Sequence, residues 1–177
     1  MKVTLDTSMD AQLSSAEIAA MRRSYGEVGL ENIPKDPFEL FSTWMAQAHA
    51  NVAIVEANAM VLSTVDHQSD ISSRTVLLKG VTDNHFIFFT NYNSRKGRAI
   101  HSQPKVALLF PWFAMERQVS ITGIAEPIPV AESDDYFASR PWGHQIGTWA
   151  SRQSDPLTHR GELEERSHAD VVAVAGG

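Results

Sequence analysis

Apolar residues in the first third of the chain recur at helical spacing. After Asp36 they stand three or four positions apart, at Phe38, Phe41, Trp44, Met45 and Ala48, and so predict a helix with one face on the core. Asp36-Pro37 supplies an N-cap and a first-turn proline. Ser14 and Glu17 have capping-box spacing and predict a short helix through Met21 toward Tyr25.

From position 59 the period becomes that of β-strands. Five β-prone runs are predicted as strands, at residues 60–65, 74–79, 86–90, 105–110 and 117–125. Thr82-Asp83-Asn84 is expected to join the second and third runs as a hairpin, while residues 66–70 and 111–115 form turns. Short connections between five strands favour a small, mostly antiparallel closed barrel over a Rossmann sheet.

The last third of the chain predicts helices and loops. Residues 131–139 are predicted to be helical and to end at Arg140-Pro141. Residues 143–154 are expected to be loop and short helix, residues 158–168 a charged helix, and residues 170–177 a short apolar strip. No repeat or second domain is evident, so we expect one domain over residues 1–177, with residues 1–13 loose.

Composition narrows the functional classes. A net charge of −6 argues against general nucleic-acid binding. The absence of cysteine excludes disulfides, thiolate nucleophiles and cysteine-bound metals. No apolar run approaches the ~20 residues of a membrane span, and no signal-peptide pattern opens the sequence, so we expect a cytoplasmic protein without membrane attachment.

One segment, residues 72–98, is basic in this acidic chain. It holds five cations against the single carboxylate of Asp83, a net charge of +4. Arg95 and Lys96 fall in the first turn of a helix that Asn93 or Ser94 can cap. Cations in the first turn of a helix are unfavourable, because the helix dipole is positive there. A bound anion would offset both charges. The segment is either a solvated basic surface or, as the cap and cations favour, a cradle for a phosphorylated small ligand.

Motifs for other chemistries are missing. The sequence contains no G-x-G-x-x-G, P-loop, H-E-x-x-H or G-x-S-x-G pattern, and its seven histidines are dispersed. We therefore predict no metal site and no side chain acting in covalent catalysis. A cradle of cations instead suits a phosphorylated organic cofactor that performs the reaction itself.

Seven short runs, in order, resemble those of the pyridoxamine 5′-phosphate oxidases: RTVLLK, FTNYNSRK, LLFPW, ERQV, YFASRP, QIG-W and SRQS. The resemblance covers roughly residues 22–164. It implies a mainly β, α+β fold: an antiparallel, Greek-key-like, FMN-binding split barrel with flanking helices. It also implies a homodimer with FMN at the interface. The implied reaction is oxidation of pyridoxamine or pyridoxine 5′-phosphate to pyridoxal 5′-phosphate by O2, with H2O2 as product.

The resemblance also assigns residues to the two ligands. The implied FMN contacts are Arg74, Thr75, Val76, Leu77, Leu78, Lys79, Phe89, Thr90, Arg95, Lys96, Gln118, Gln153 and Ser154. The implied substrate contacts are Lys79, Tyr136, Arg140 and His144, with Arg22 and Tyr25 as an N-terminal lid. His144 stands where the family has a serine, and the family often has tyrosine in place of Phe89.

Two alternatives accompany this interpretation. The family's C-terminal W-G-G-[FY]-R, W-Q-G and R-L-H-D-R motifs, which give further FMN and substrate contacts, do not occur in this sequence. That favours a non-catalytic protein that binds FMN or pyridoxal phosphate. A flavin oxidoreductase of the same fold with another substrate, as in the phenazine-pathway oxidases, is the second alternative.

Overall fold

The structure is a computed structural model, and it describes residues 14–21, 24, 26, 33–159, 161, 162, 164 and 166. By its contacts the chain divides into two compact units, Met1–Ile33 and Pro34–Gly177. The first unit holds helix α1 (Ser15–Ala20), and the predicted capping box forms between Ser14 and Glu17. That the whole chain acts as one domain stays a prediction, and residues 1–13 lie outside the described part.

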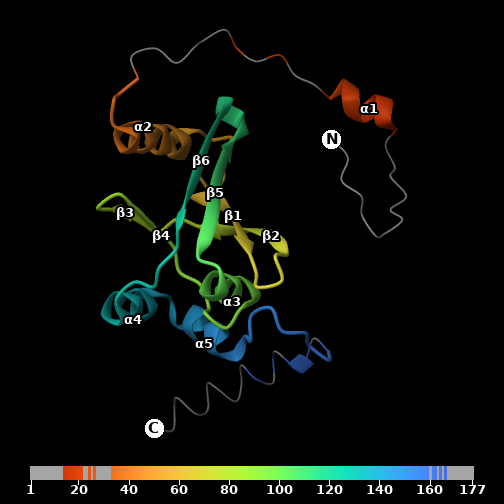
Figure 1. Ribbon diagram of the computed structural model, residues 1–177, viewed down its shortest axis with the longest axis vertical. Helices are drawn as coiled ribbons and strands as arrows, with labels where there is room; N and C mark the ends of the chain where they lie inside the picture. The colour runs from red at the N-terminus through yellow and green to blue at the C-terminus, as the bar shows by residue number, and fades with distance from the viewer. Residues whose placement is uncertain are drawn as a thin grey trace. The chain divides into compact units, whose positions relative to one another are not determined.

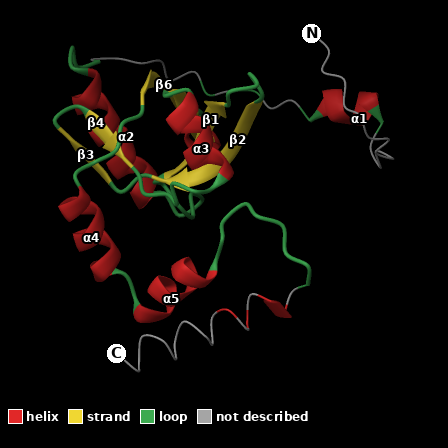
Figure 2. Ribbon diagram, turned by 60° about the horizontal axis from the view of Figure 1, so that its bottom comes forward, coloured by secondary structure: helices red, strands yellow, loops and turns green. Residues whose placement is uncertain are grey.

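The second unit carries all the strands of the described chain. Its elements are α2 (Pro37–Ala50), β1 (Ala59–Val65), β2 (Ile71–Leu77), β3 (Gly80–Thr82), β4 (His85–Ile87), α3 (Arg95–Ser102), β5 (Lys105–Trp112), the 3₁₀ turn η1 (Phe113–Met115), β6 (Arg117–Ile124), α4 (Val130–Ser139) and α5 (Trp142–Ala150) (Figure 1). Every strand pair is antiparallel, in a four-stranded sheet of order β2-β1-β5-β6 and a two-stranded sheet of β3 and β4. Figure 2 shows α4 and α5 set apart from the strands. The predicted α+β class is therefore confirmed.

The predicted central hairpin is wrong in its pairing. Strand β2 pairs with β1, with Arg74 opposite Leu62, rather than with residues 86–90. The hairpin in this region joins the shorter strands β3 and β4, and both of its turn residues, Asp83 and Asn84, have positive φ. Asp and Asn tolerate that conformation, which matches the strand twist. The hydrogen-bonded ladder is thus divided between two sheets instead of closing as one barrel.

A second correction concerns residues 111–115, predicted as a turn. Strand β5 continues through Pro111 to Trp112 before the 3₁₀ turn. Pro111 is tolerated because β1 pairs with β5 only as far as Leu109, so on that side no partner needs the N–H that proline lacks. On the other side Pro111 lies opposite Gln118 of β6.

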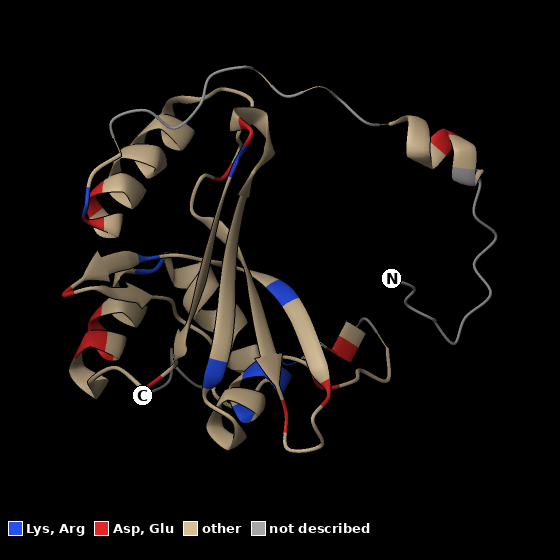
Figure 3. Ribbon diagram, turned by 45° about the horizontal axis from the view of Figure 1, so that its top comes forward, with Lys and Arg blue, Asp and Glu red and all other residues tan. Residues whose placement is uncertain are grey.

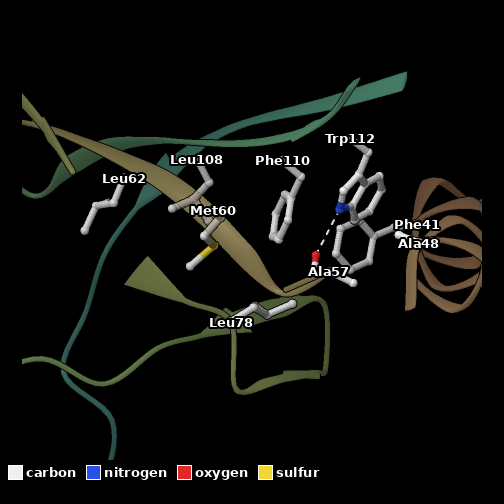
Figure 4. Close-up of a cluster of buried hydrophobic side chains, with 9 residues drawn as sticks. All are labelled: Phe41, Ala48, Ala57, Met60, Leu62, Leu78, Leu108, Phe110 and Trp112. Carbon is white, nitrogen blue, oxygen red and sulfur yellow. Dashed lines mark hydrogen bonds between the residues drawn. The ribbon is translucent and has the colours of Figure 1, made fainter. Parts of the chain in front are cut away.

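The core lies on one face of the larger sheet. Alternate residues of β1 and β5 are buried there and meet two side chains of α2 (Figure 4); the cluster is Met60, Leu62, Leu108, Phe110, Trp112, Phe41 and Ala48, with Ala57 and Leu78. Trp112 also donates its indole N–H to the carbonyl of Ala57 at 2.9 Å. Each large side chain buried in this way stabilises the fold by roughly 1.5–3 kcal/mol.

The opposite face of the same sheet is open in the described chain. Outward positions follow the alternation of the strands, and Ile71 and Ile124 on this face are 75% and 58% exposed. Ser63 and Ser73 form a cross-strand hydroxyl pair there at 2.8 Å. None of the described helices is long and apolar enough to cross a membrane.

Candidate anion-binding site

Helix α3 begins with a buried serine cap followed by two cations. The Ser94 hydroxyl accepts the backbone N–H of Gly97 at 3.2 Å and donates to the Asn91 carbonyl at 2.6 Å. No acidic residue stands in the first turn of α3, which opens with Arg95 and Lys96. The helix dipole and both residues therefore contribute positive charge to the first turn of α3, as predicted.

Lys96 is buried although it is a lysine. Its residue is 8% exposed, and its Nζ donates to Oε1 of Gln153 at 2.8 Å and reaches Oγ of Ser94 at 3.4 Å. Burial lowers the pKa of Lys96, and the charge of Arg74 lowers it further. The predicted partners Lys96 and Gln153, far apart in sequence, are thus brought together.

Arg74 projects from β2 on the core side of the sheet. Its Nη1 donates to the Leu62 carbonyl at 3.0 Å and to the Thr64 hydroxyl at 2.9 Å, while Nη2 donates to the Ser72 hydroxyl. Burial lowers the pKa of the Arg74 guanidinium, and Arg95 lowers it further. Neutral oxygens fix this guanidinium in place but leave its charge uncompensated. Figure 3 shows the basic segments on β2 and α3.

Few carboxylates balance these cations. Among the described residues the structure has one ion pair within 4.0 Å, between Arg166 and Glu162. The charge of Arg95 acts on the carboxylate of Asp66. Its pKa is lowered first by the backbone N–H of Asp70 and, more weakly, by Arg95. Arg74, Arg95 and Lys96 have no carboxylate within ion-pair distance among the described residues, so their charges remain available to an anion.

Thr90 adds a polar atom to this region of the chain. Its Oγ1 is buried and has no hydrogen-bond partner among the described residues. Buried hydroxyls are nearly always bonded, so an unpaired one indicates a group that a ligand can satisfy. The preceding residue, Phe89, stacks on Tyr136 of α4, with ring centroids 3.6 Å apart and planes at 7°. This contact joins a predicted cofactor residue to a predicted substrate residue.

Two of the predicted substrate residues, Arg140 and His144, lie at the corner between α4 and α5. Arg140 is half-buried, and its Nη1 donates to the Thr148 hydroxyl at 2.7 Å. The His144 side chain is exposed, and its backbone N–H donates to the Pro141 carbonyl at 2.8 Å. Tyr136 lies four residues before Arg140 and stacks on Phe89. The predicted contacts of the substrate and of the cofactor are therefore neighbours at this point of the fold.

Other predicted residues are not gathered around the cations. By strand alternation Val76 shares the inward face with Arg74, whereas Thr75 and Leu77 face outward. Leu78 is buried in the core, and the side chains of Lys79, Gln118 and Ser154 are exposed. Arg22 and Tyr25 lie outside the described residues.

Two shallow hollows in the described chain lie elsewhere. One, of about 450 Å³, is lined between α2 and β3 by residues that include Phe41, Met45, His49 and Lys79. The other, of about 480 Å³, crosses the open face of the larger sheet near Ile71 and Ile124. Of the predicted site residues, Leu78 and Lys79 line the first hollow, and neither hollow is lined by Arg74 or Lys96.

Sequence reasoning missed the neutral residues that hold the cations. Thr64 and Ser72 lie opposite each other on β1 and β2 and bind Arg74. Thr64 stands at an inward position of an otherwise apolar strand. Because a buried hydroxyl needs a hydrogen-bond partner, its position could have indicated a polar contact there. Gln145 and Thr148 were missed as well. Their contacts with Arg140 depend on the angle between two helices, which no local pattern specifies.

The fold is that of an antiparallel two-sheet protein, and its cations Arg74, Arg95 and Lys96 are arranged as expected for an anionic ligand. Comparison with known proteins identifies the family to which the chain belongs. A profile of the family described as "Pyridoxamine 5'-phosphate oxidase" matches residues 46–169. The chain belongs to the pyridoxamine 5′-phosphate oxidase family, and the predictions of that family and of an oxidoreductase are confirmed.

Relatives named pyridoxine/pyridoxamine 5′-phosphate oxidase align over most of the chain. The protein from Nocardioides sp. is 47% identical over 150 residues, which cover 84% of this chain and 70% of the relative. The proteins from Rubrobacter xylanophilus and Bordetella pertussis are also 47% identical and are covered over 70% and 71% of their length, with 85% and 84% of this chain aligned.

Solved structures share the fold. PhzG from Burkholderia lata 383, in complex with tetrahydrophenazine-1-carboxylic acid, matches with a TM-score of 0.76 and 28% identity, covering 84% of this chain and 74% of that one. A pyridoxamine 5′-phosphate oxidase-related, FMN-binding protein from Nostoc punctiforme matches with a TM-score of 0.57 and 16% identity, over 75% and 73% of the two chains. The second likeness supports the fold alone.

Proposed function

We propose that this protein is an FMN-dependent oxidase that converts pyridoxamine or pyridoxine 5′-phosphate to pyridoxal 5′-phosphate, with O2 as acceptor and H2O2 as product. The observation that carries the proposal is the set of cations Arg74, Arg95 and Lys96 around the start of α3, none with a carboxylate within ion-pair distance among the described residues, in a chain of this family. The cytoplasmic location stays a prediction from the sequence.

The residues present fit the phosphate of FMN. A dianion at the start of α3 would offset the charges of Arg95 and Lys96 and accept hydrogen bonds from Lys96 Nζ and free backbone N–H groups. The unpaired hydroxyl of Thr90 is available as a further donor. When bound, FMN supplies the two-electron chemistry at the C4′ carbon, which the protein's own side chains cannot perform.

For the substrate, the protein's task is to hold a second phosphate and to orient the ring. The proposed contacts are Tyr136 on α4, Arg140 just after α4, His144 on α5 and Lys79 after β2, with the predicted lid residues Arg22 and Tyr25. Arg140 has no carboxylate within ion-pair distance among the described residues, so its charge remains available to a phosphate. This binding would fix the position of C4′, and alignment of reacting atoms is a major source of rate enhancement.

We further propose that the protein is a homodimer with FMN at the interface. The open sheet face carries the exposed Ile71 and Ile124 and is hollowed between them. The predicted cofactor residues Thr75, Leu77 and Gln118 point toward this same side, away from the cations. Pairing of two such faces would cover the apolar surface and would bring outward and inward cofactor contacts to one flavin.

A second candidate is a flavin oxidoreductase with a tricyclic carboxylate substrate. The likeness to PhzG, at a TM-score of 0.76 over 84% of the chain, favours it. The two candidates share the FMN residues and differ in whether the substrate carries a phosphate. The charge of Arg140, which has no carboxylate within ion-pair distance among the described residues, suits either anion.

The proposal is tested by adding pyridoxine 5′-phosphate to the purified protein under anaerobic conditions and recording the visible spectrum. Loss of the flavin band, followed by its return and by H2O2 on admission of air, is the expected result. A yellow protein that stays yellow with pyridoxine 5′-phosphate but bleaches with a dihydrophenazine carboxylate would establish the second candidate. A yellow protein inert to both would identify a non-catalytic flavin-binding protein.

A further inference from the structure

Arg140 occupies the corner where α4 ends and α5 begins. Because Pro141 follows it, its backbone is extended, with φ −74° and ψ 147°. Gln145 of α5 reaches back, and its Nε2 donates to the carbonyls of Arg140 at 2.8 Å and Ala138 at 3.2 Å. These bonds satisfy carbonyls left free at the end of α4, and they fix the backbone of Arg140 against α5.

The side chain of Arg140 is fixed from the same helix. The Thr148 hydroxyl donates its one hydrogen to the His144 carbonyl at 2.8 Å. Its lone pairs therefore face the guanidinium, and it accepts from Arg140 Nη1 at 2.7 Å. A neutral acceptor of this kind orients the cation without cancelling its charge.

Most donors of Arg140 remain available. A guanidinium carries five N–H bonds, and within the described chain the structure gives this one a single hydrogen-bond partner and no ion pair. The guanidinium is thus half-buried and held in one orientation, with its remaining N–H groups unused. Such preorganisation lowers the entropy that an arginine loses when it binds an anion.

We propose that Thr148 is a positioning residue that holds Arg140 ready for the phosphate of the substrate. This inference rests on the proposed function for the identity of the ligand. Thr148 acts through Arg140 without touching the phosphate itself, so its removal should weaken the binding of phosphorylated substrate and leave the chemical step and the FMN site unchanged.

The chain offers a matched control for Thr148. Thr43 of α2 also donates its hydroxyl to the carbonyl four residues earlier, Glu39, at 3.0 Å, but the structure gives it no arginine partner. Thr148→Val and Thr43→Val therefore remove the same helical hydrogen bond, and only the first removes an acceptor from Arg140. Thr148→Ser restores the hydroxyl.

The test measures kcat and KM for pyridoxine 5′-phosphate, the Kd of pyridoxal 5′-phosphate by calorimetry, the Kd of FMN and the Tm for each flavin-loaded variant. In Thr148→Val we expect KM and the Kd of pyridoxal 5′-phosphate to rise about 2- to 12-fold, as for a side chain that must be ordered on binding. We expect kcat and the Kd of FMN to stay within twofold, Thr148→Ser to restore binding, and Thr43→Val to resemble wild type.

Unchanged binding in Thr148→Val would overturn the inference. So would a loss that Thr43→Val reproduces, or one that Thr148→Ser does not restore, because either would indicate a merely structural hydroxyl. If the wild type binds pyridoxal 5′-phosphate without oxidising pyridoxine 5′-phosphate, the oxidase proposal fails while the Kd comparison still decides the role of Thr148. A wild type that does neither overturns both.

Discussion

Replacing Lys96 by methionine should weaken the binding of FMN and raise the free energy of unfolding of the flavin-free protein. Lys96 is 8% exposed, lies beside the charge of Arg74, and bonds only to the neutral oxygens of Gln153 and Ser94 among the described residues. Methionine keeps the length of the side chain and removes the charge. The flavin-free protein then no longer holds an uncompensated buried ammonium, whereas the FMN phosphate loses a cationic donor.

Two magnitudes follow. Loss of one charge-assisted hydrogen bond, worth about 1.5–3 kcal/mol, should weaken FMN binding roughly 10- to 160-fold. Removal of the buried charge should raise the free energy of unfolding of the flavin-free protein by about 1 kcal/mol. Riboflavin lacks the phosphate, so its affinity should change less than about twofold.

Quenching of flavin fluorescence measures both affinities, and urea unfolding of the flavin-free protein measures stability. Arg98→Met is the control, because Arg98 is an exposed cation on the same helix whose Nη1 bonds to the Asn93 carbonyl. A Lys96→Met protein that is less stable and loses FMN and riboflavin equally would refute the reasoning, since Lys96 would then be a structural residue.

Three further predictions follow from the same site. Because the pKa of Lys96 is lowered in the folded state, the unfolded state binds more protons between that pKa and the ordinary value near ~10.4. The unfolding free energy of the flavin-free wild type should therefore rise with pH through this window relative to Lys96→Met, and a fall measured in urea titrations would contradict the assigned sign. Gly97→Ala places a Cβ 2.3 Å from the Tyr92 carbonyl oxygen and should destabilise the protein by about 1–3 kcal/mol despite alanine's higher helix propensity; an unchanged urea midpoint would show that the loop yields. The double variant Arg95→Ala, Lys96→Ala should bind FMN at least about 100-fold more weakly, and equilibrium titration giving wild-type affinity would rule out the cradle.

Local signals in the sequence predicted the local structure well. The caps at Ser14, Asp36 and Ser94 all form, because each depends on a side chain and a backbone N–H two or three residues apart. The cations at the start of α3 were recognisable for the same reason. The family could also be predicted, since its motifs are short, specific and in order.

The partners of the strands and the burial of Lys96 could not be predicted from local sequence signals. Residues 74–79 have β-prone neighbours on both sides, and their propensity does not say that β1 rather than β4 is the partner. The burial of Lys96 depends on Gln153, 57 residues away. The role of Thr148 depends on how two helices meet at Arg140. Each is set by tertiary contacts that leave no periodic trace in the sequence.

A crystal structure of the FMN-loaded protein tests the central claim most directly. We expect the flavin phosphate at the start of α3, with oxygens within about 3 Å of Lys96 Nζ and the Arg95 guanidinium. A phosphate bound instead in the hollow between α2 and β3, beside His49 and Lys79, with Lys96 still bonded only to Gln153 and Ser94, would contradict it.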